Sequence, residues 1–127
     1  MVIEEKVVIT GEMVGKFAEL VNDHNQIHVD DEYAKGTVFG GRIAHGMLVG
    51  SLFSGVLARN FPGCIYVRQE LDFRKPIKVG STVTVSVEHV STTTDGSKKS
   101  MRYGIECMVK RDDGEVAVIG NAMISVR

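Results

Sequence analysis

Apolar residues recur along this chain with two different periods, and the change of period predicts its architecture. From Met13 to Val21 they return every three or four positions, as on one face of a helix. From Ala44 to about Asn60 apolar and small residues cover almost the whole helical circumference, and within that run no charge appears before Arg59. A helix that is apolar nearly all round is a buried helix. Pro62-Gly63 ends it, and the period then becomes two.

The period of two indicates strands. A first strand is expected at Val2–Ile9, where β-branched residues are frequent, and further alternating runs cover about 65–73, 83–88, 101–109 and 116–126. Asp95-Gly96 and Asp113-Gly114 are hairpin signals between the last three runs. Consecutive strands joined by tight turns predict an antiparallel sheet with one apolar face, against which the apolar helix packs as a second layer. The predicted fold class is α+β.

A polar segment separates the two predicted helices. Thr10 has the side chain of an N-cap for the first helix, which should end near Asn22 or Asp23 because short polar side chains compete for backbone hydrogen bonds. Asp23 is therefore expected at a helix end and His28 on the loop that follows. The three glycines between Gly36 and Arg42 predict another loop.

Composition limits the classes of function. A chain of 127 residues fits one domain, 1–127, and its net charge of -1 offers no basic face for nucleic acid. Cys64 and Cys107 fall in apolar runs and are expected to be buried, reduced thiols. The N-terminus shows no basic-then-apolar leader, and no run approaches the roughly 18 apolar residues of a membrane span. We therefore expect a cytoplasmic protein without a membrane partner.

Two short segments carry the candidate chemistry. Asp23–His28 places a carboxylate and an imidazole five residues apart in a polar stretch, and Ile43–Leu48 opens the buried helix with Gly46 in its first turn. A carboxylate and an imidazole can transfer protons, and the free N–H groups of a helix start can stabilise a developing negative charge. Together they predict a site for acid–base chemistry on a substrate that develops an oxyanion.

Plainer interpretations stay open for these residues. Asp23 could simply cap a helix end, and an isolated His28 is more often a surface histidine. His45 is expected to be structural, hydrogen-bonded near the helix start, with substrate contact as the alternative. His24 and His28 have the spacing of helical metal ligands, but no third ligand stands at a suitable spacing, so no metal is predicted.

The order of several motifs resembles a known family. Asp-x-Asn-x-Ile-His, Ile-Ala-His-Gly-Met-Leu, Ser-Leu-x-Ser, Pro-Gly and Leu-x-Phe-x-x-Pro-Ile-x-x-Gly follow one another between about Val21 and Val90. This series is similar to the MaoC-like hydratases, and within them to the single-domain (R)-specific enoyl-CoA hydratases. The resemblance implies a single MaoC-like hotdog domain over 1–127, in which an antiparallel β-sheet wraps around a long buried central helix.

The resemblance also implies roles for particular residues. The family's catalytic aspartate and histidine match Asp23 and His28, and its glycine at the start of the central helix matches Gly46. Asn25 and Ser54 also match family positions, and together with His45, a candidate from its own place near the helix start, they are expected to be substrate-binding or supporting residues. Ser54 lies about 12 Å along the helix from Gly46, too far to share one oxyanion, so it is expected to support Asp23 or His28. The family usually has proline where this chain has Gln26.

The expected activity is that of an (R)-specific enoyl-CoA hydratase working reversibly as a 3-hydroxyacyl-CoA dehydratase, with no organic cofactor and no metal. The alternatives are an acyl-CoA thioesterase, a carrier-protein-linked 3-hydroxyacyl dehydratase, and a non-catalytic hotdog module that binds acyl thioesters. The expected partners are an acyl-CoA substrate and further copies of the chain, as a homodimer or a dimer of dimers. A five-stranded sheet leaves an unpaired edge, which predicts that two copies join edge to edge.

Overall fold

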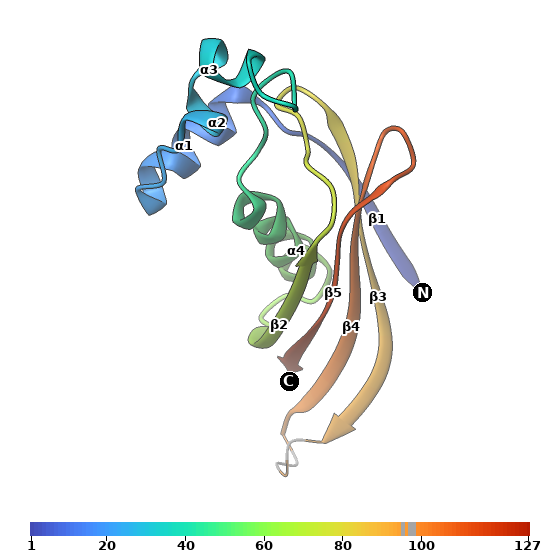
Figure 1. Cartoon of the computed structure of the whole chain (residues 1–127). Coiled ribbons are helices and arrows are strands. Elements are labelled where there is room, and N and C mark those ends of the chain that lie inside the picture. Colours follow the sequence, from blue (N-terminus) through green and yellow to red (C-terminus); the bar gives the residue numbers. More distant parts are fainter. Residues whose placement is uncertain (95, 97–98) are drawn as a thin grey trace.

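The computed structural model describes residues 1–94, 96 and 99–127, and it shows a sheet curved around one long helix (Figure 1). The elements in chain order are β1 (Val2–Val8), α1 (Gly11–Val21), α2 (Gln26–Val29), α3 (Asp31–Lys35), α4 (Gly46–Asn60), β2 (Ile65–Phe73), β3 (Thr82–Thr94), β4 (Met101–Arg111) and β5 (Val116–Val126). The predicted α+β class is confirmed.

All strand pairs of the sheet are antiparallel, in the order β1-β3-β4-β5-β2. The first two strands of the chain therefore form its two edges, and the later meander fills the space between them. The hairpin predicted at Asp113-Gly114 is confirmed, since Gly114 has a φ of 86° and its N–H donates to the Arg111 carbonyl. For the other predicted hairpin, Asp95 lies outside the described residues.

The core lies between α4 and the concave face of the sheet. Most of its fully or almost fully buried side chains come from every second position of the strands and from one side of the helix: Leu48, Val49, Phe53, Val56, Leu57, Val83, Val85, Val87, Ile105, Cys107, Val109, Ala122 and Ile124. Both cysteines are free, and burial raises the pKa of the Cys107 thiol to about 11. This thiol stays protonated near neutral pH and is not a nucleophile there.

The central helix differs from its prediction in two respects. It begins at Gly46 rather than Ala44, with His45 as its N-cap residue. In the single chain it is not buried all round, because one side, formed by Met47, Ser51, Ser54 and Ala58, is exposed. Met47 alone retains 61% of its accessible surface. The helix was predicted to be buried all round because this side carries no charge. The sheet of one chain covers only the opposite side.

The three short helices gather beyond the N-terminal end of α4 (Figure 1). Thr10 is the N-cap of α1 as predicted, since its hydroxyl accepts a hydrogen bond from the Met13 N–H at 3.1 Å. The same helix ends at Asn22, which adopts the left-handed conformation with a φ of 57°. The predicted loop position of His28 is wrong, because residues 26–29 close a single helical turn. Among the described residues no helix is long and apolar enough to cross a membrane.

Candidate functional site

A pocket of about 540 Å³ opens at the N-terminal end of α4. It is enclosed by α1, the segment around α2, the first turns of α4 and the end of β2. Its walls are mostly apolar, with the polar groups gathered at one side: Phe17, Val21, Asp23, His28, His45, Gly46, Met47, Ser51 and Phe73. Apolar walls with a few convergent polar groups are typical of a small-molecule site.

Asp23 is held at the C-terminal end of α1. Its N–H donates to the Ala18 carbonyl at 3.0 Å, which continues the left-handed turn at Asn22. One carboxylate oxygen accepts from the Asn25 N–H at 3.2 Å and from the Asn25 side-chain amide at 2.7 Å. These hydrogen bonds, the backbone one first, and the neighbouring imidazoles lower the pKa of Asp23 against the opposing effect of partial burial. The carboxylate that lines the pocket is therefore ionised at neutral pH.

His28 lies in α2, and the backbone carbonyl of Ile43 orients its ring. Its Nδ1 lies 2.8 Å from the Ile43 carbonyl oxygen, which can only accept, so Nδ1 carries the hydrogen. In the neutral ring the lone pair is then on Nε2, the nitrogen left for a substrate or water. Arg42 adds support, since it donates to the His28 carbonyl at 3.3 Å and forms an ion pair with Asp31 at 2.7 Å.

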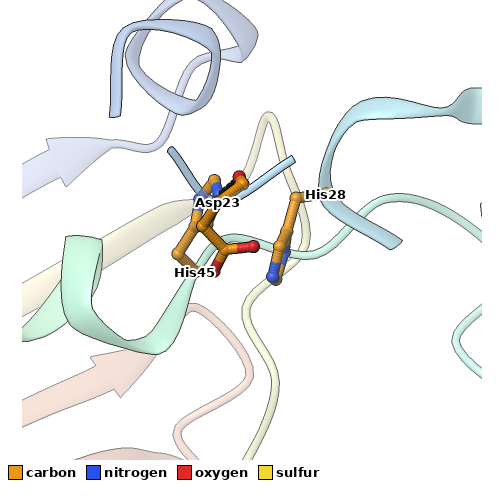
Figure 2. A group of neighbouring side chains, drawn as sticks. All are labelled: Asp23, His28 and His45. Carbon is orange, nitrogen blue, oxygen red and sulfur yellow. Dashed lines mark hydrogen bonds between the residues drawn. The ribbon is translucent and has the colours of Figure 1, made fainter. Parts of the chain in front are cut away.

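His45 connects these two residues. It is only 2% exposed, and its Nε2–H donates to the main-chain carbonyl of Asp23 at 3.0 Å. Its ring stacks on that of His28 with 3.9 Å between centroids and 27° between planes, and it is tilted against Phe17 at 5.1 Å. Figure 2 shows the three side chains together, with the Asp23 carboxylate directed toward His28.

The three residues also fit the chemical types of metal ligands. One potential ligand atom of each lies within 4.8 Å of the others. From sequence spacing only His24 and His28 were considered as ligands, and no metal was predicted; the third member of this cluster, His45, is 17 positions beyond His28. Stacked imidazoles direct their in-plane lone pairs side by side rather than at one point, so the arrangement suits proton transfer better than tetrahedral coordination.

Gly46 brings the start of α4 to the same pocket. The amides of Gly46, Met47 and Leu48 precede the first intrahelical hydrogen bond, in which the Val49 N–H donates to the His45 carbonyl at 3.2 Å. A Cβ at Gly46 would lie 3.0 Å from Cδ1 of Phe73, so the small residue allows β2 to pack closely on the helix start. The positive end of the helix and its N–H groups can stabilise an oxygen that gains negative charge.

The other sequence candidates have different positions. Asn25 holds the Asp23 carboxylate but does not line the pocket. Ser54 is exposed on the outer side of α4 and is not among the lining residues, whereas Ser51, one turn earlier, is. The Ser51 hydroxyl donates to the Leu48 carbonyl at 2.6 Å.

Sequence reasoning did not select Arg42, Ser51 or Phe73. Arg42 directly precedes the Ile43–Leu48 segment, and its position beside that motif was the one available signal. Phe73 belongs to β2 and to the Leu-x-Phe-x-x-Pro-Ile-x-x-Gly motif, which indicated the family but no role for this side chain. Both act through contacts that form only after folding.

The chain is similar in sequence to known proteins. The sequence model described as "MaoC like domain" matches residues 2–110. The chain is 40% identical over 112 residues to an (R)-specific enoyl-CoA hydratase of Rhodospirillum rubrum, covering 87% of this chain and 74% of that protein. It is 32% identical over 123 residues to a mitochondrial 3-hydroxyacyl-[acyl-carrier-protein] dehydratase of Arabidopsis thaliana, covering 93% and 74%.

A solved structure agrees over the whole length. The (R)-hydratase of A. caviae involved in PHA biosynthesis superposes with a TM-score of 0.92 at 33% identity, covering 100% of this chain and 95% of that one. The hotdog fold expected from the motifs is thereby confirmed, and so is the resemblance to MaoC-like hydratases. These relatives are named hydratases or dehydratases, and they differ in whether coenzyme A or an acyl-carrier protein carries the acyl group.

Proposed function

Since this chain belongs to the MaoC-like domain family, we propose that it is an (R)-specific enoyl-CoA hydratase, which reversibly adds water to trans-2-enoyl-CoA. The observation that carries the proposal is the convergence of the Asp23 carboxylate, the His28 ring and the Gly46 helix start on one apolar pocket. Each of these groups corresponds to one requirement of the reaction. A protein that only binds acyl thioesters has no need of a paired acid and base.

The reaction can be written with these groups. The Asp23 carboxylate accepts a proton from a water molecule as the oxygen of that water forms a bond to C3 of the substrate. The C2=C3 electron pair moves toward the thioester, whose oxygen becomes an enolate stabilised by the amides at the start of α4. C2 then takes a proton from the Asp23–His28 pair, so that one water is added overall and the pair returns to its starting state. General acid–base catalysis of this kind typically contributes about 10²–10⁴-fold.

The orientation of His28 supports its role as the second partner. Because Nδ1–H is committed to the Ile43 carbonyl, Nε2 is available to hold the attacking water or to pass its proton. The hydrogen bonds from Asn25 keep Asp23 ionised, which suits a base. The two residues thus divide the task, one accepting the proton and the other orienting and sharing it.

A carrier-protein-linked 3-hydroxyacyl dehydratase is the second candidate. The relative from Arabidopsis thaliana acts in that class by its name, and it matches this chain over nearly the same length as the hydratases do. The chemistry at C2 and C3 would be identical, and only the group that carries the acyl chain would differ. A thioesterase is less consistent with the site, since it would need water to be directed at the carbonyl carbon rather than at C3.

We further propose that the protein works as a homodimer joined along β2. This edge strand and the neighbouring side of α4 expose apolar residues that the single chain does not cover: Met47, Ile65, Val67 and Phe73. An unpaired, partly apolar edge is a surface that proteins normally cover. Light scattering should give twice the chain mass, and Ile65→Lys should shift it toward the monomer. Val38→Lys, at a loop residue that is 97% exposed, is the matched control and should leave the mass unchanged. A monomer mass for the parent protein contradicts this assembly.

The activity is tested by incubating purified protein with trans-2-butenoyl-CoA and, separately, with the same acyl group on an acyl-carrier protein. The expected product is (R)-3-hydroxybutyryl-CoA, identified by chiral chromatography after hydrolysis. Turnover of the carrier-protein thioester alone would favour the dehydratase alternative, and release of free coenzyme A would favour a thioesterase. Binding without any conversion would favour the non-catalytic module. The cytoplasmic location expected from the sequence stays a prediction.

A further inference from the structure

We propose that His45 is the residue that positions Asp23 and His28 relative to each other, and that its Nε2–H bond to Asp23 matters more for this than its ring stack. The inference rests on the proposed hydratase function and adds to it a positioning residue that does not touch the reacting atoms. It is carried by three contacts of one side chain: the hydrogen bond to the Asp23 carbonyl, the stack on His28 and the tilted contact with Phe17.

The two proposed catalytic residues have little direct connection. Asp23 follows the end of α1, where its carboxylate is held locally by Asn25, and His28 lies in a separate single-turn helix. Helix α1 contributes Val14 to the core, but α2, which carries His28, has no buried residue. A short polar segment of this kind needs a fixed reference if its two side chains are to keep a productive geometry.

His45 can supply that reference because it is almost fully buried. The residue is 2% exposed, and as the N-cap residue it is directly followed by Gly46, the start of the proposed oxyanion site. The same backbone segment contributes the Ile43 carbonyl that orients the His28 ring. One stretch of three residues, Ile43–His45, therefore places the base, its partner and the helix start in a single frame.

The chemistry of the ring points to positioning rather than to proton transfer. With Nε2–H donated to Asp23, the lone pair of neutral His45 is on Nδ1, which is buried and without a hydrogen-bond partner among the described residues. A nitrogen enclosed in this way cannot exchange a proton with a substrate in the pocket. An unpaired buried nitrogen also lowers stability, so its presence is better explained by the hydrogen bond made by the opposite side of the ring.

Two substitutions separate the contributions of His45. His45→Phe retains an aromatic ring that can stack on His28 but removes the donor to Asp23. His45→Gln retains an N–H near the position of Nε2 but removes the stack. The expected order of kcat is parent, then Gln, then Phe, with Phe about 10- to 100-fold below parent, since small misplacements of catalytic groups have effects of this size. KM should change by less than about threefold, because the substrate contacts remain.

A merely structural residue would give a different pattern. In His45→Phe an apolar ring replaces one with an unpaired buried nitrogen, and the half-buried Asp23 carbonyl can bind water instead. The melting temperature should therefore stay near that of the parent protein while kcat falls. The matched control is His89→Phe, which also alters a stacked histidine whose Nε2 meets a backbone carbonyl, but at the opposite end of α4. It should leave kcat unchanged.

NMR spectroscopy tests positioning without relying on turnover. In His45→Phe the amide and side-chain signals of Asp23 and His28 should broaden or split as the two residues lose their common reference, and in His45→Gln they should stay close to those of the parent. Parent-like kcat and unperturbed signals in His45→Phe would overturn the inference, and so would a fall in kcat that simply follows the melting temperature. If the parent protein hydrates no enoyl thioester, the proposed function fails, and the NMR result still decides whether His45 positions the pair.

Discussion

Helix α4 has a stacked histidine at each of its ends, and one of the two stacks lines the pocket beside Asp23. At the N-terminal end His45 stacks on His28 at 3.9 Å, and at the C-terminal end His89 stacks on Tyr103 at 4.0 Å. The ring geometries are nearly the same. Their surroundings differ in charge, in hydrogen bonding and in access to a pocket.

At the C-terminal end the rings form a closed structural cluster. Phe61, the C-cap residue of α4, contacts Tyr103 edge-on at 5.7 Å and His89 at 6.4 Å. The Nε2 of His89 already meets the Ser91 carbonyl at 2.9 Å and the Thr92 hydroxyl at 2.8 Å. Among the described residues no hydrogen bond or ion pair joins His89 to a carboxylate. The negative end of the helix dipole is also nearby, and it disfavours a developing anion.

At the N-terminal end the same kind of stack leaves one nitrogen available beside a carboxylate. Nε2 of His28 faces a pocket, Asp23 stands next to it, and the positive end of α4 is adjacent. The comparison shows that a stacked histidine alone says little about function. The helix end that it occupies and the nitrogen that remains unpaired decide what it can do.

The largest effect should come from removing the carboxylate. Asp23→Asn retains the size and most of the hydrogen bonding of the side chain but loses the base, so hydration should fall at least about 10²-fold. His28→Ala should give a similar fall, and the double variant should lose less than the product of the two, because the residues act as a unit. Steady-state kinetics with an enoyl-CoA measures this, with circular dichroism to establish folding. A rate for Asp23→Asn close to the parent rate would reduce Asp23 to a helix-end residue.

The contribution of the helix start to catalysis is tested by comparing alanine substitutions at Gly46 and at Gly50, one turn further along α4. An added Cβ at Gly46 would lie 3.0 Å from Phe73, and at Gly50 it would lie 2.6 Å from Cδ1 of Leu71. Both alanine variants press on β2, and crowding of this kind typically costs about 1–3 kcal/mol, partly offset by the roughly 1 kcal/mol helix preference of alanine over glycine. Only Gly46→Ala should also lower kcat/KM, by about tenfold or more, since it hinders approach to the oxyanion site. Equal kcat/KM for two folded variants would place that site elsewhere.

A smaller effect is expected from the hydrogen bonds that hold Asp23. Asn25→Ala removes the side-chain donor but leaves the backbone N–H, so the pKa of Asp23 should rise from its lowered value toward that of an ordinary aspartate. A base with a lowered pKa is active down to that pKa and loses activity as the pH falls through it. The acid limb of the kcat/KM profile should therefore move to higher pH in the variant. An unmoved limb would mean that another group sets it.

The smallest effect on activity should come from the opposite end of the helix. His89→Ala removes one ring of the stack and the hydrogen bonds to Ser91 and Thr92, so the free energy of unfolding should fall by about 1–2 kcal/mol. Urea denaturation measures this loss. Turnover should equal that of the parent protein, and a loss of rate without a loss of stability would mean that the two ends of α4 are coupled.

Much of this molecule could be predicted from local patterns. Alternation identified the strands, the Thr10 cap and the polar residues after Val21 bounded the first helix, and the motif Ile43–Leu48 located the start of α4 within two residues. Such features depend on neighbours in the chain and on the periods of 3.6 and 2, so the sequence contains them directly. The resemblance carried by the same motifs identified the family.

Other features became visible only in the folded chain. The strand order, with β1 and β2 at opposite edges, depends on pairing between residues far apart in the sequence. So do the contacts of His45 with Asp23 and His28. Which side of α4 stays exposed depends on where the sheet packs against it. By itself the sequence determined the strands, the two longer helices and the residue types available for acid–base chemistry, since these follow from local periodicity and side-chain chemistry. The tertiary structure decided which histidine meets the carboxylate and which nitrogen remains unpaired, because long-range packing sets the distances and angles on which those contacts depend.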